Sequence, residues 1–328
     1  MGKYLLKRLG QMVLVVIVVA FFTFLMVNMI PGDIVYIVAG TDEMDQTMYD
    51  TIYYELGLDI PVFQRFLVWG WNALHLDFGK SYTMNMPVFD VIASRLPFTI
   101  YLSVLSMLVS VPIGIVLGIV CAVNRRTKID TTITLISNTL NSLPQFWVGI
   151  VLLYLLSLKL KWLPTLGFDF PWNIGFGKHI KLLIMPLTCL SLGGIAGFTR
   201  QTRSSMLEVL RADYLRTARA KGVPEQRVIR KHALSNAWIP ILTTLGGAIA
   251  GAVSGSAVIE MVFSFPGIGR MLVEAINARD VTTTMGCVVL TTTFYVLMQL
   301  AVDLMYAFVD PRIKSLYSNT SRKRRLVA

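Results

Sequence analysis

The stretch that decides the fold covers residues 199–237 and reads TRQTRSSMLEVLRADYLRTARAKGVPEQRVIRKHALSNA. The first helix is predicted from apolar residues at helical spacing, which are Leu207, Leu210, Tyr214, Leu215 and Ala218. Gly222-Val223-Pro224 then breaks the run, and a second short helix is predicted. The stretch holds nine basic and three acidic residues. Between membrane-crossing segments, such an excess of basic residues indicates a cytoplasmic connection. We therefore interpret it as a helix-turn-helix that lies on the membrane surface and is presented to a cytoplasmic partner.

The sequence on either side of this stretch is strongly apolar. Of the 328 residues, 55% are hydrophobic, and the mean hydropathy is +0.63. A helix needs about 20 mostly apolar residues to cross a bilayer, and six runs meet this requirement. They predict an all-α integral membrane protein with six transmembrane helices, the first of which stays as an anchor because its apolar core is longer than that of a signal peptide. The runs cover residues 9–30, 98–123, 132–160, 182–198, 238–263 and 284–309.

The distribution of charge predicts the orientation of these helices. Basic residues gather before the first run, after the second, in residues 199–237 and after the sixth, which places both termini in the cytoplasm. Residues 31–97 hold nine acidic and three basic residues, as expected of an outer segment. Lysines between positions 159 and 181 run against this assignment, which all other connections support. We predict an N-terminal transmembrane helix with an extracytoplasmic segment (1–97), a transmembrane core (98–309) and a basic cytoplasmic tail (310–328).

The outer segment contains aromatic side chains among its acidic residues. Phe63, Phe66, Trp69, Trp71 and Phe78 predict a small amphipathic cap at the outer membrane interface. Such a cap either contacts an external partner or covers helix ends, and the sequence leaves both interpretations open.

Polar residues inside the apolar runs are candidates for a solute pathway, because they are costly when they face lipid. In the third run they surround Pro144, which predicts a kink that serves either a gate or a packing adjustment. In the fifth run, glycines at four-residue spacing predict either close helix packing or a mobile helix beside a pathway or subunit interface. The pathway candidates are Asn138, Asn141, Ser142 and Gln145 in the third run and Ser254 in the fifth.

Signals for chemistry are weak. The stretch Gly79-Lys80-Ser81 resembles the end of a phosphate-binding loop but lacks its first glycine. The three histidines and three cysteines are dispersed, so we expect no catalytic residues, no metal site and no disulfide framework. Asp303 is an acid deep in the sixth run, and we interpret it as a structural hydrogen-bonding group rather than a proton relay. The net charge of +11 fits membrane topology and does not indicate a nucleic-acid partner.

The residues 214–222, YLRTARAKG, carry a resemblance to a known family. They are similar to the coupling motif of ABC importer permeases, in the form found in the dipeptide and oligopeptide group. The resemblance extends over most of the chain, although Arg216-Thr217-Ala218, Leu234-Ser235 and Val281-Thr282 depart from the general pattern. Its other motifs are Met29-Ile30-Pro31-Gly32-Asp33, Leu56-Gly57-Leu58-Asp59, Asp77-Phe78-Gly79-Lys80-Ser81, Arg95-Leu96-Pro97, Ser142-Leu143-Pro144-Gln145-Phe146-Trp147, Glu260-Met261-Val262-Phe263, Pro266-Gly267-Ile268-Gly269-Arg270 and Asp310-Pro311-Arg312.

The resemblance implies a type I ABC importer permease fold and a B-type permease subunit that forms half of a pathway for short peptides. It implies a second permease subunit, two cytoplasmic ATPase subunits that bind ATP and magnesium, and an extracytoplasmic binding protein, with no cofactor in this chain. Movement of residues 207–236 as a lever would couple ATP hydrolysis to transport in the cytoplasmic membrane. A nickel or other small-solute permease, a secondary transporter and a membrane scaffold stay as alternatives. The implied coupling residues are Tyr214, Arg216, Thr217, Ala218, Arg219, Ala220, Lys221, Gly222 and Pro224.

Overall fold

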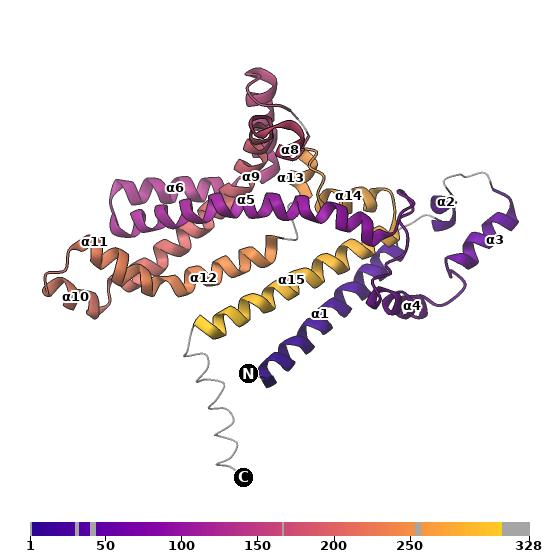
Figure 1. Ribbon diagram of the computed structural model, residues 1–328, viewed down its shortest axis with the longest axis horizontal. Coiled ribbons are helices and arrows are strands. Elements are labelled where there is room, and N and C mark those ends of the chain that lie inside the picture. Colours follow the sequence, from indigo (N-terminus) through magenta and orange to yellow (C-terminus); the bar gives the residue numbers. More distant parts are fainter. Residues whose placement is uncertain (1, 30–32, 40–43, 166, 253–256, 310–328) are drawn as a thin grey trace, which may run out of the picture. The chain divides into compact units, whose positions relative to one another are not determined.

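The computed structural model (Figure 1) describes residues 2–29, 33–39, 44–165, 167–252 and 257–309. The chain divides into two compact units. Unit 1 contains Met1–Thr99 and Pro266–Leu297, and unit 2 contains Ile100–Phe265 and Met298–Ala328. Two long helices, α5 (Val88–Val123) and α15 (Val281–Val309), contribute residues to both units.

Unit 1 combines the first long helix with the outer segment that follows it. Its core is built where the start of α5, the helix α14 and the start of α15 meet, and it buries Phe78, Val88, Ile92, Met271 and Cys287. Phe66 and Trp69 pack against this core, whereas Phe63 and Trp71 are mostly exposed. The predicted cap is therefore amphipathic, with part of its aromatic set directed inward. Its helices are α1 (Gly2–Asn28), α2 (Ile34–Ala39), α3 (Gln46–Glu55), α4 (Val62–Leu74) and α14 (Ile268–Asn277).

Unit 2 is a helical bundle organised around one long helix, α9 (Phe176–Leu210), which contacts α6, α7 and α12. Its remaining elements follow one another with short connections, and two of them are π-helical, η1 and η2. They are α6 (Lys128–Ser142), α7 (Gln145–Leu152), η1 (Leu153–Lys159), α8 (Pro171–Ile174), α10 (Asp213–Ala220), α11 (Glu225–Arg227), η2 (Val228–Ala233), α12 (Leu234–Gly251) and α13 (Ala257–Val262).

Within unit 2, α5 and α9 approach closely at two glycines. A Cβ atom added at Gly118 would lie 2.5 Å from the Cβ of Thr202 and 2.8 Å from the carbonyl oxygen of Thr199, and Gly114 is equally tight against Phe198. No larger residue fits without separating the helices. In the fifth run the outcome differs, because an added Cβ at Gly247 or Gly251 would meet nothing within 4 Å. Among the described residues, these two glycines do not serve close packing.

The described residues contain five helices long and apolar enough to cross a membrane, and the pair formed by Lys128–Ser142 and Gln145–Lys159 brings the number to six. This confirms the six predicted runs. The third run is broken by a bend of 94°, where Leu143 is extended and Pro144 precedes α7. The kink predicted at Pro144 is confirmed. In the fifth run, α12 ends at Gly251 and α13 begins at Ala257, and residues 253–256 between them lie outside the described residues.

One expectation for residues 199–237 was wrong. The surface helix was predicted to include Leu207 and Leu210, but both belong to the end of α9. The chain breaks at Ala212, whose ψ of 142° is extended, before α10 begins at Asp213. No glycine or proline marks this break, so the helical spacing of the apolar residues predicted one continuous helix across it. The basic tail 310–328, Ser254 and the motif residues 30–32 and 310–312 lie outside the described residues.

Candidate functional site

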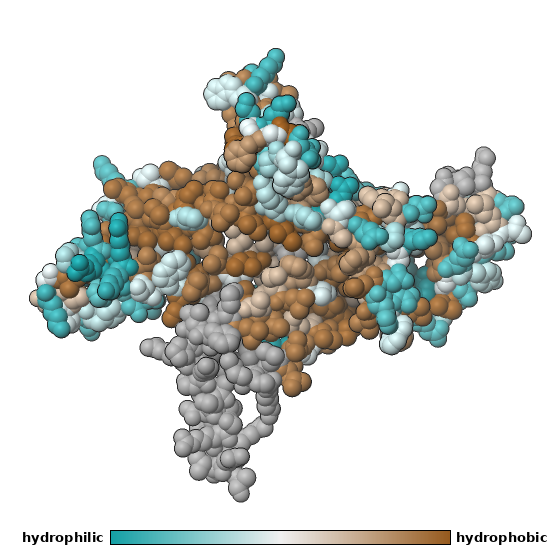
Figure 2. Space-filling model, viewed as in Figure 1, coloured by the Kyte–Doolittle hydropathy of each residue, from teal (hydrophilic) through white to brown (hydrophobic). Residues whose placement is uncertain are grey.

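The candidate site is the connection between α9 and α12, which consists of α10, a tight turn, α11 and η2. In Figure 1 the labels α10 and α11 lie at one end of unit 2, beyond the ends of α6 and α12. Figure 2 shows hydrophilic side chains gathered there, next to a hydrophobic surface over α5 and α6. The connection is thus a polar protrusion from an apolar bundle.

The turn after α10 is a Schellman motif centred on Gly222. The φ of Gly222 is +77°, a left-handed value that glycine adopts at little cost. The N–H of Gly222 donates to the carbonyl of Arg219 at 2.9 Å, and the N–H of Val223 donates to the carbonyl of Ala218 at 3.2 Å. Pro224 then caps α11, where it costs no helical hydrogen bond. The predicted turn is confirmed, and it fixes the path of the chain from α10 to α11.

An ion pair closes the same turn from its outer side. The Arg219 guanidinium donates to both carboxylate oxygens of Glu225, from Nε at 3.0 Å and from Nη2 at 2.8 Å. The two side chains are 38% and 55% exposed, and pairs this exposed contribute only about 0–1 kcal/mol. The bidentate geometry therefore orients α11 on α10 more than it stabilises the fold.

The connection is anchored to the bundle by a small apolar cluster. Leu215, the buried residue of α10, is fully enclosed. It belongs to a cluster with Met206 from α9, Val228 and Ala233 from η2, and Ile241 from α12. Burying a leucine side chain is worth about 1.5–3 kcal/mol. Leu215 thus packs α10 against both helices that the connection joins.

The opposite face of the connection is exposed among the described residues. Most of the residues implied as coupling residues lie on this face, whereas Ala218 is half-buried beneath it. Arg216 keeps 75% of its side chain exposed even though it contacts Asp213. The face is suited to bind an acidic or polar surface. Its exposed members are Tyr214, Arg216, Thr217, Arg219, Ala220, Lys221, Gly222 and Pro224.

A buried ion pair braces the bundle near this connection. Asp130, at the start of α6, accepts from the Nε and Nη2 of Arg203 on α9 at 2.7 and 2.8 Å. The Asp130 side chain is 6% exposed and also accepts from the N–H of Arg126. Breaking such a pair is costly because the remaining charge is left without its partner. Sequence reasoning missed this pair, although an acid at the start of an apolar run is the signal that could have found it.

The pathway candidates do not gather at one place. Gln145 lines a cavity of about 330 Å³ between helices of unit 2. Three other candidates are exposed residues near the break between α6 and α7, and they do not line this cavity. They are Asn138, Asn141 and Ser142. The other polar side chains of the cavity are Ser103, Ser106 and Ser110 of α5. Their spacing of three and four residues places them on one helix face, a signal that the apolar composition of the second run concealed.

In unit 1, a buried carboxylate joins two loops. Asp280 is fully buried and accepts from the hydroxyls of Ser81 at 2.6 Å, Thr283 at 2.8 Å and Thr282 at 3.0 Å. Burial by itself would raise the pKa of Asp280, but the hydrogen bonds from Ser81, Thr283 and Thr282 outweigh it and hold the pKa below its ordinary value. The stretch Gly79-Lys80-Ser81, which resembled a phosphate-binding loop, thus has a structural role.

Comparison with known proteins identifies the family. Residues 114–315 match the family described as binding-protein-dependent transport system inner membrane component, and residues 1–103 match the N-terminal membrane component of the same systems. The chain is 38% identical to a Brucella abortus (strain 2308) protein named as a peptide transport system permease, over 96% of this chain and 99% of the relative. It is 36% identical to the dipeptide transport system permease protein DppB of Escherichia coli (strain K12), again over 96% and 99%.

Solved structures agree in fold. The chain superposes on a subunit of the inward-facing MetNI methionine ABC transporter with a TM-score of 0.54 at 19% identity, covering 67% of this chain and 96% of that one. A second crystal form of the same transporter gives a TM-score of 0.53 at 18% identity with the same coverage. The sequence families and the helical fold agree, and the chain belongs to the inner-membrane components of binding-protein-dependent transport systems, as a permease subunit of the ABC importer type.

Proposed function

We propose that this chain forms half of the pathway of an ATP-driven importer of short peptides, with the connection from α10 to η2 as the element that receives work from an ATPase. The observation that carries the proposal is the turn at Gly222. Two backbone hydrogen bonds close this turn, the Arg219–Glu225 ion pair spans it, and the buried Leu215 packs the preceding helix against the bundle, while the outer face stays exposed. A rigid element of this kind transmits displacement without any catalytic side chain.

The partners follow from this role. The exposed face of α10 and its turn would bind one of two cytoplasmic ATPase subunits, which hold ATP and magnesium. A second, related permease would complete the pathway, and an extracytoplasmic binding protein would deliver the solute to the outer segment. The chain itself supplies transport and no hydrolysis. The excess of basic residues in 199–237 supports a cytoplasmic position for the connection and for both termini, in a cytoplasmic membrane.

The connection would act on several helices at once. Closure of the paired ATPases would move α10, and Leu215 would pass this movement to α9 and α12 through its shared cluster. The Asp130–Arg203 pair would carry the movement of α9 into α6, which leads to the bend before α7. Helices on both sides of the cavity that contains Gln145 would then tilt together, and this would open the pathway to one side or the other.

Peptides are proposed as the cargo because relatives that span the whole chain carry the names of peptide and dipeptide permeases. The cavity of unit 2 supports this with hydroxyl and amide side chains, which can hydrogen bond to peptide groups without selecting a side chain.

The test is uptake into proteoliposomes. The chain is purified with the second permease, the ATPases and the binding protein of the proposed importer, and uptake of a radiolabelled dipeptide is compared with uptake of ⁶³Ni²⁺. We expect dipeptide uptake that requires ATP and the binding protein, and no uptake of nickel. Uptake of nickel alone would replace the proposed cargo, and absence of ATP-dependent uptake of either solute would contradict the proposed function.

A further inference from the structure

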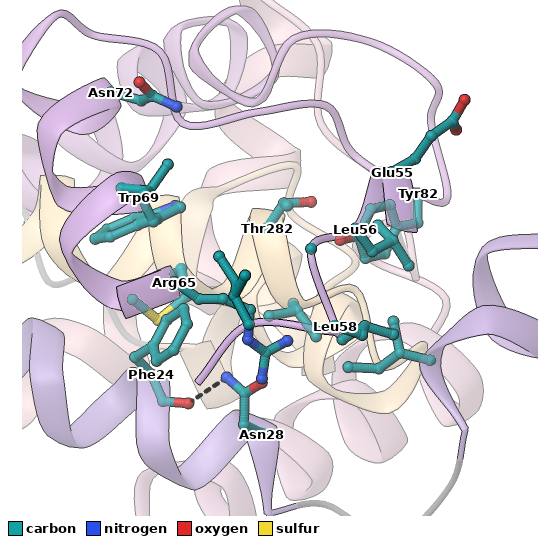
Figure 3. Close-up of a pocket in the computed structure, with 16 residues that line it drawn as sticks. Phe24, Asn28, Glu55, Leu56, Leu58, Arg65, Trp69, Asn72, Tyr82 and Thr282 are labelled. Carbon is teal, nitrogen blue, oxygen red and sulfur yellow. Dashed lines mark hydrogen bonds between the residues drawn. The ribbon is translucent and has the colours of Figure 1, made fainter. Parts of the chain in front are cut away.

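Unit 1 contains a cavity whose polar lining has no role in the proposed coupling mechanism. It has a volume of about 280 Å³ and lies between α1, α4, the loop after α3 and the start of α15 (Figure 3). Phe24, Leu56 and Val68 contribute apolar walls, while Asn28, Arg65 and Trp69 contribute polar atoms. The cavity is large enough for a small polar group.

One face of α4 supplies the donors of this cavity. Arg65, Trp69 and Asn72 are spaced by four and three residues, so they lie along one side of the helix. The Nη2 of Arg65 donates to the side-chain oxygen of Asn28 at 2.8 Å. The Nε of Arg65 and the indole Nε1 of Trp69 are buried and have no hydrogen-bond partner among the described residues. Two buried N–H donors without acceptors, one helical turn apart on the face of α4 that lines the cavity, are costly in a folded protein.

The charge of the cavity is also uncompensated. Arg65 makes no ion pair within the part of the chain that the structure describes. Besides Asn28, its guanidinium lies over the ring of Phe24 at 6.0 Å and interacts electrostatically with Tyr82, which also lines the cavity. Glu55 also lines the cavity but is exposed, and Figure 3 shows its carboxylate directed away from Arg65. A partly buried guanidinium is the side chain best suited to a planar anion, because it offers parallel N–H donors.

We infer that this cavity is a binding site for a carboxylate, held by the guanidinium of Arg65 and the indole N–H of Trp69. A carboxylate supplies the acceptors that both orphan donors need, neutralises Arg65, and leaves the apolar walls for the carbon chain that carries it. The site rests on the geometry of unit 1 alone. The source of the carboxylate rests on the proposed function. In an importer, the outer segment would meet either the C-terminal carboxylate of a delivered peptide or an acidic side chain of a docking protein.

The test measures binding of four blocked peptides to the full chain in lipid nanodiscs by isothermal titration calorimetry. The first pair is acetyl-Ala-Ala with a free carboxylate and its C-terminal amide, which reports a terminal carboxylate. The second pair is acetyl-Ala-Glu-Ala-amide and acetyl-Ala-Gln-Ala-amide, which reports a side-chain carboxylate. In at least one pair we expect the carboxylate to bind about tenfold or more tightly than its neutral counterpart, and the pair that shows this identifies the source.

Variants assign the binding to the cavity. Arg65→Gln should abolish the preference for the carboxylate, and Trp69→Phe, which keeps an aromatic ring but removes the N–H, should weaken carboxylate binding about two- to tenfold. Lys80→Gln removes an exposed positive charge from the same segment, outside the cavity, and should leave binding unchanged. Thermal unfolding of each variant verifies that the fold is retained, and Trp69→Phe still tests the site if Arg65→Gln unfolds.

Three results would overturn the inference: equal binding of acid and amide in both pairs, no binding of any peptide, or a preference for the carboxylate that persists in both Arg65→Gln and Trp69→Phe. Absence of binding would mean that the cavity holds water only. Because the measurement needs no ATPase and no transport, its failure is distinguishable from failure of the proposed function.

Discussion

Replacing Gly222 with alanine tests whether the geometry of the turn carries the coupling. An added Cβ would meet nothing within 4 Å, so the substitution introduces no clash. Its cost comes from the backbone, because the φ of +77° places a residue with a Cβ in the left-handed region at about 1–2 kcal/mol. This free energy lowers the ratio of closed to open turn by about fivefold to thirtyfold. Gly222→Ala should therefore loosen the connection without disturbing the bundle.

The assay is the number of dipeptides transported per ATP hydrolysed by the reconstituted importer. We expect this ratio to fall in Gly222→Ala while ATP hydrolysis continues and the thermal unfolding of the bundle is unchanged. Gly177→Ala is the matched control, because Gly177 has open space around it and lies in α9 without a left-handed φ. A ratio that stays at the wild-type value in Gly222→Ala, or that falls equally in Gly177→Ala, would show that the left-handed turn at Gly222 is not what couples hydrolysis to transport.

Three further predictions concern the helices that the connection moves and the loop that closes unit 1. Gly118→Ala should destabilise the protein by about 1–3 kcal/mol through overpacking, seen as a lower thermal unfolding temperature. Gly197→Ala should not, because nothing lies within 4 Å of the new Cβ. Equal effects of the two substitutions would contradict the close packing of α5 against α9. Asp130→Asn should lower stability by about 1.5–3 kcal/mol, because Arg203 loses its charge-assisted hydrogen bonds to a buried carboxylate. Asp213→Asn, at an exposed pair, should change stability little, and similar losses of both variants in chemical denaturation would contradict the bracing role. The folded-state pKa of Asp280 is lowered, so its contribution to stability is complete above its ordinary pKa of about 4 and is lost as the pH falls below that value. Asp280→Asn should therefore flatten the decline in unfolding temperature at acidic pH. An unchanged pH profile would contradict the stabilising role of the Asp280 carboxylate.

The parts of the fold that follow from local pattern could be predicted from the sequence. Hydrophobic runs of membrane length and the breaks at Pro144 and Gly222 depend on neighbouring residues, and the structure contains them. The break at Ala212 could not be predicted in this way. It is an alanine in an extended conformation between two helices, and alanine favours the helix when only local propensity acts. Beyond this break, Leu215 packs against Met206, Val228 and Ile241, and these contacts between separate elements are not contained in the local residue pattern.

The candidate sites divide along the same line. The residues that the family resemblance implies for coupling lie in one short stretch of sequence, and in the structure most of them are exposed. The carboxylate of Asp280 contacts Ser81, 199 positions away, and the guanidinium of Arg203 reaches Asp130 across 73 positions. Neither pairing leaves a periodic signal in one sequence. The same applies to Arg65 and Asn28, which only the packing of α4 near the end of α1 brings together.

The proposed coupling mechanism depends most on contact between the connection and an ATPase. In cells that produce the importer, Ala220→Cys places a thiol on the exposed face of α10, and the native Cys121, Cys189 and Cys287 are buried and should react little. A photoreactive maleimide attached at this position should crosslink to the ATPase, with a yield that changes when a non-hydrolysable ATP analogue is added. The same reagent at Thr47→Cys in the outer segment should capture no ATPase. Absence of an ATPase crosslink from position 220, or modification of position 220 by a membrane-impermeant reagent added outside intact cells, would contradict the account.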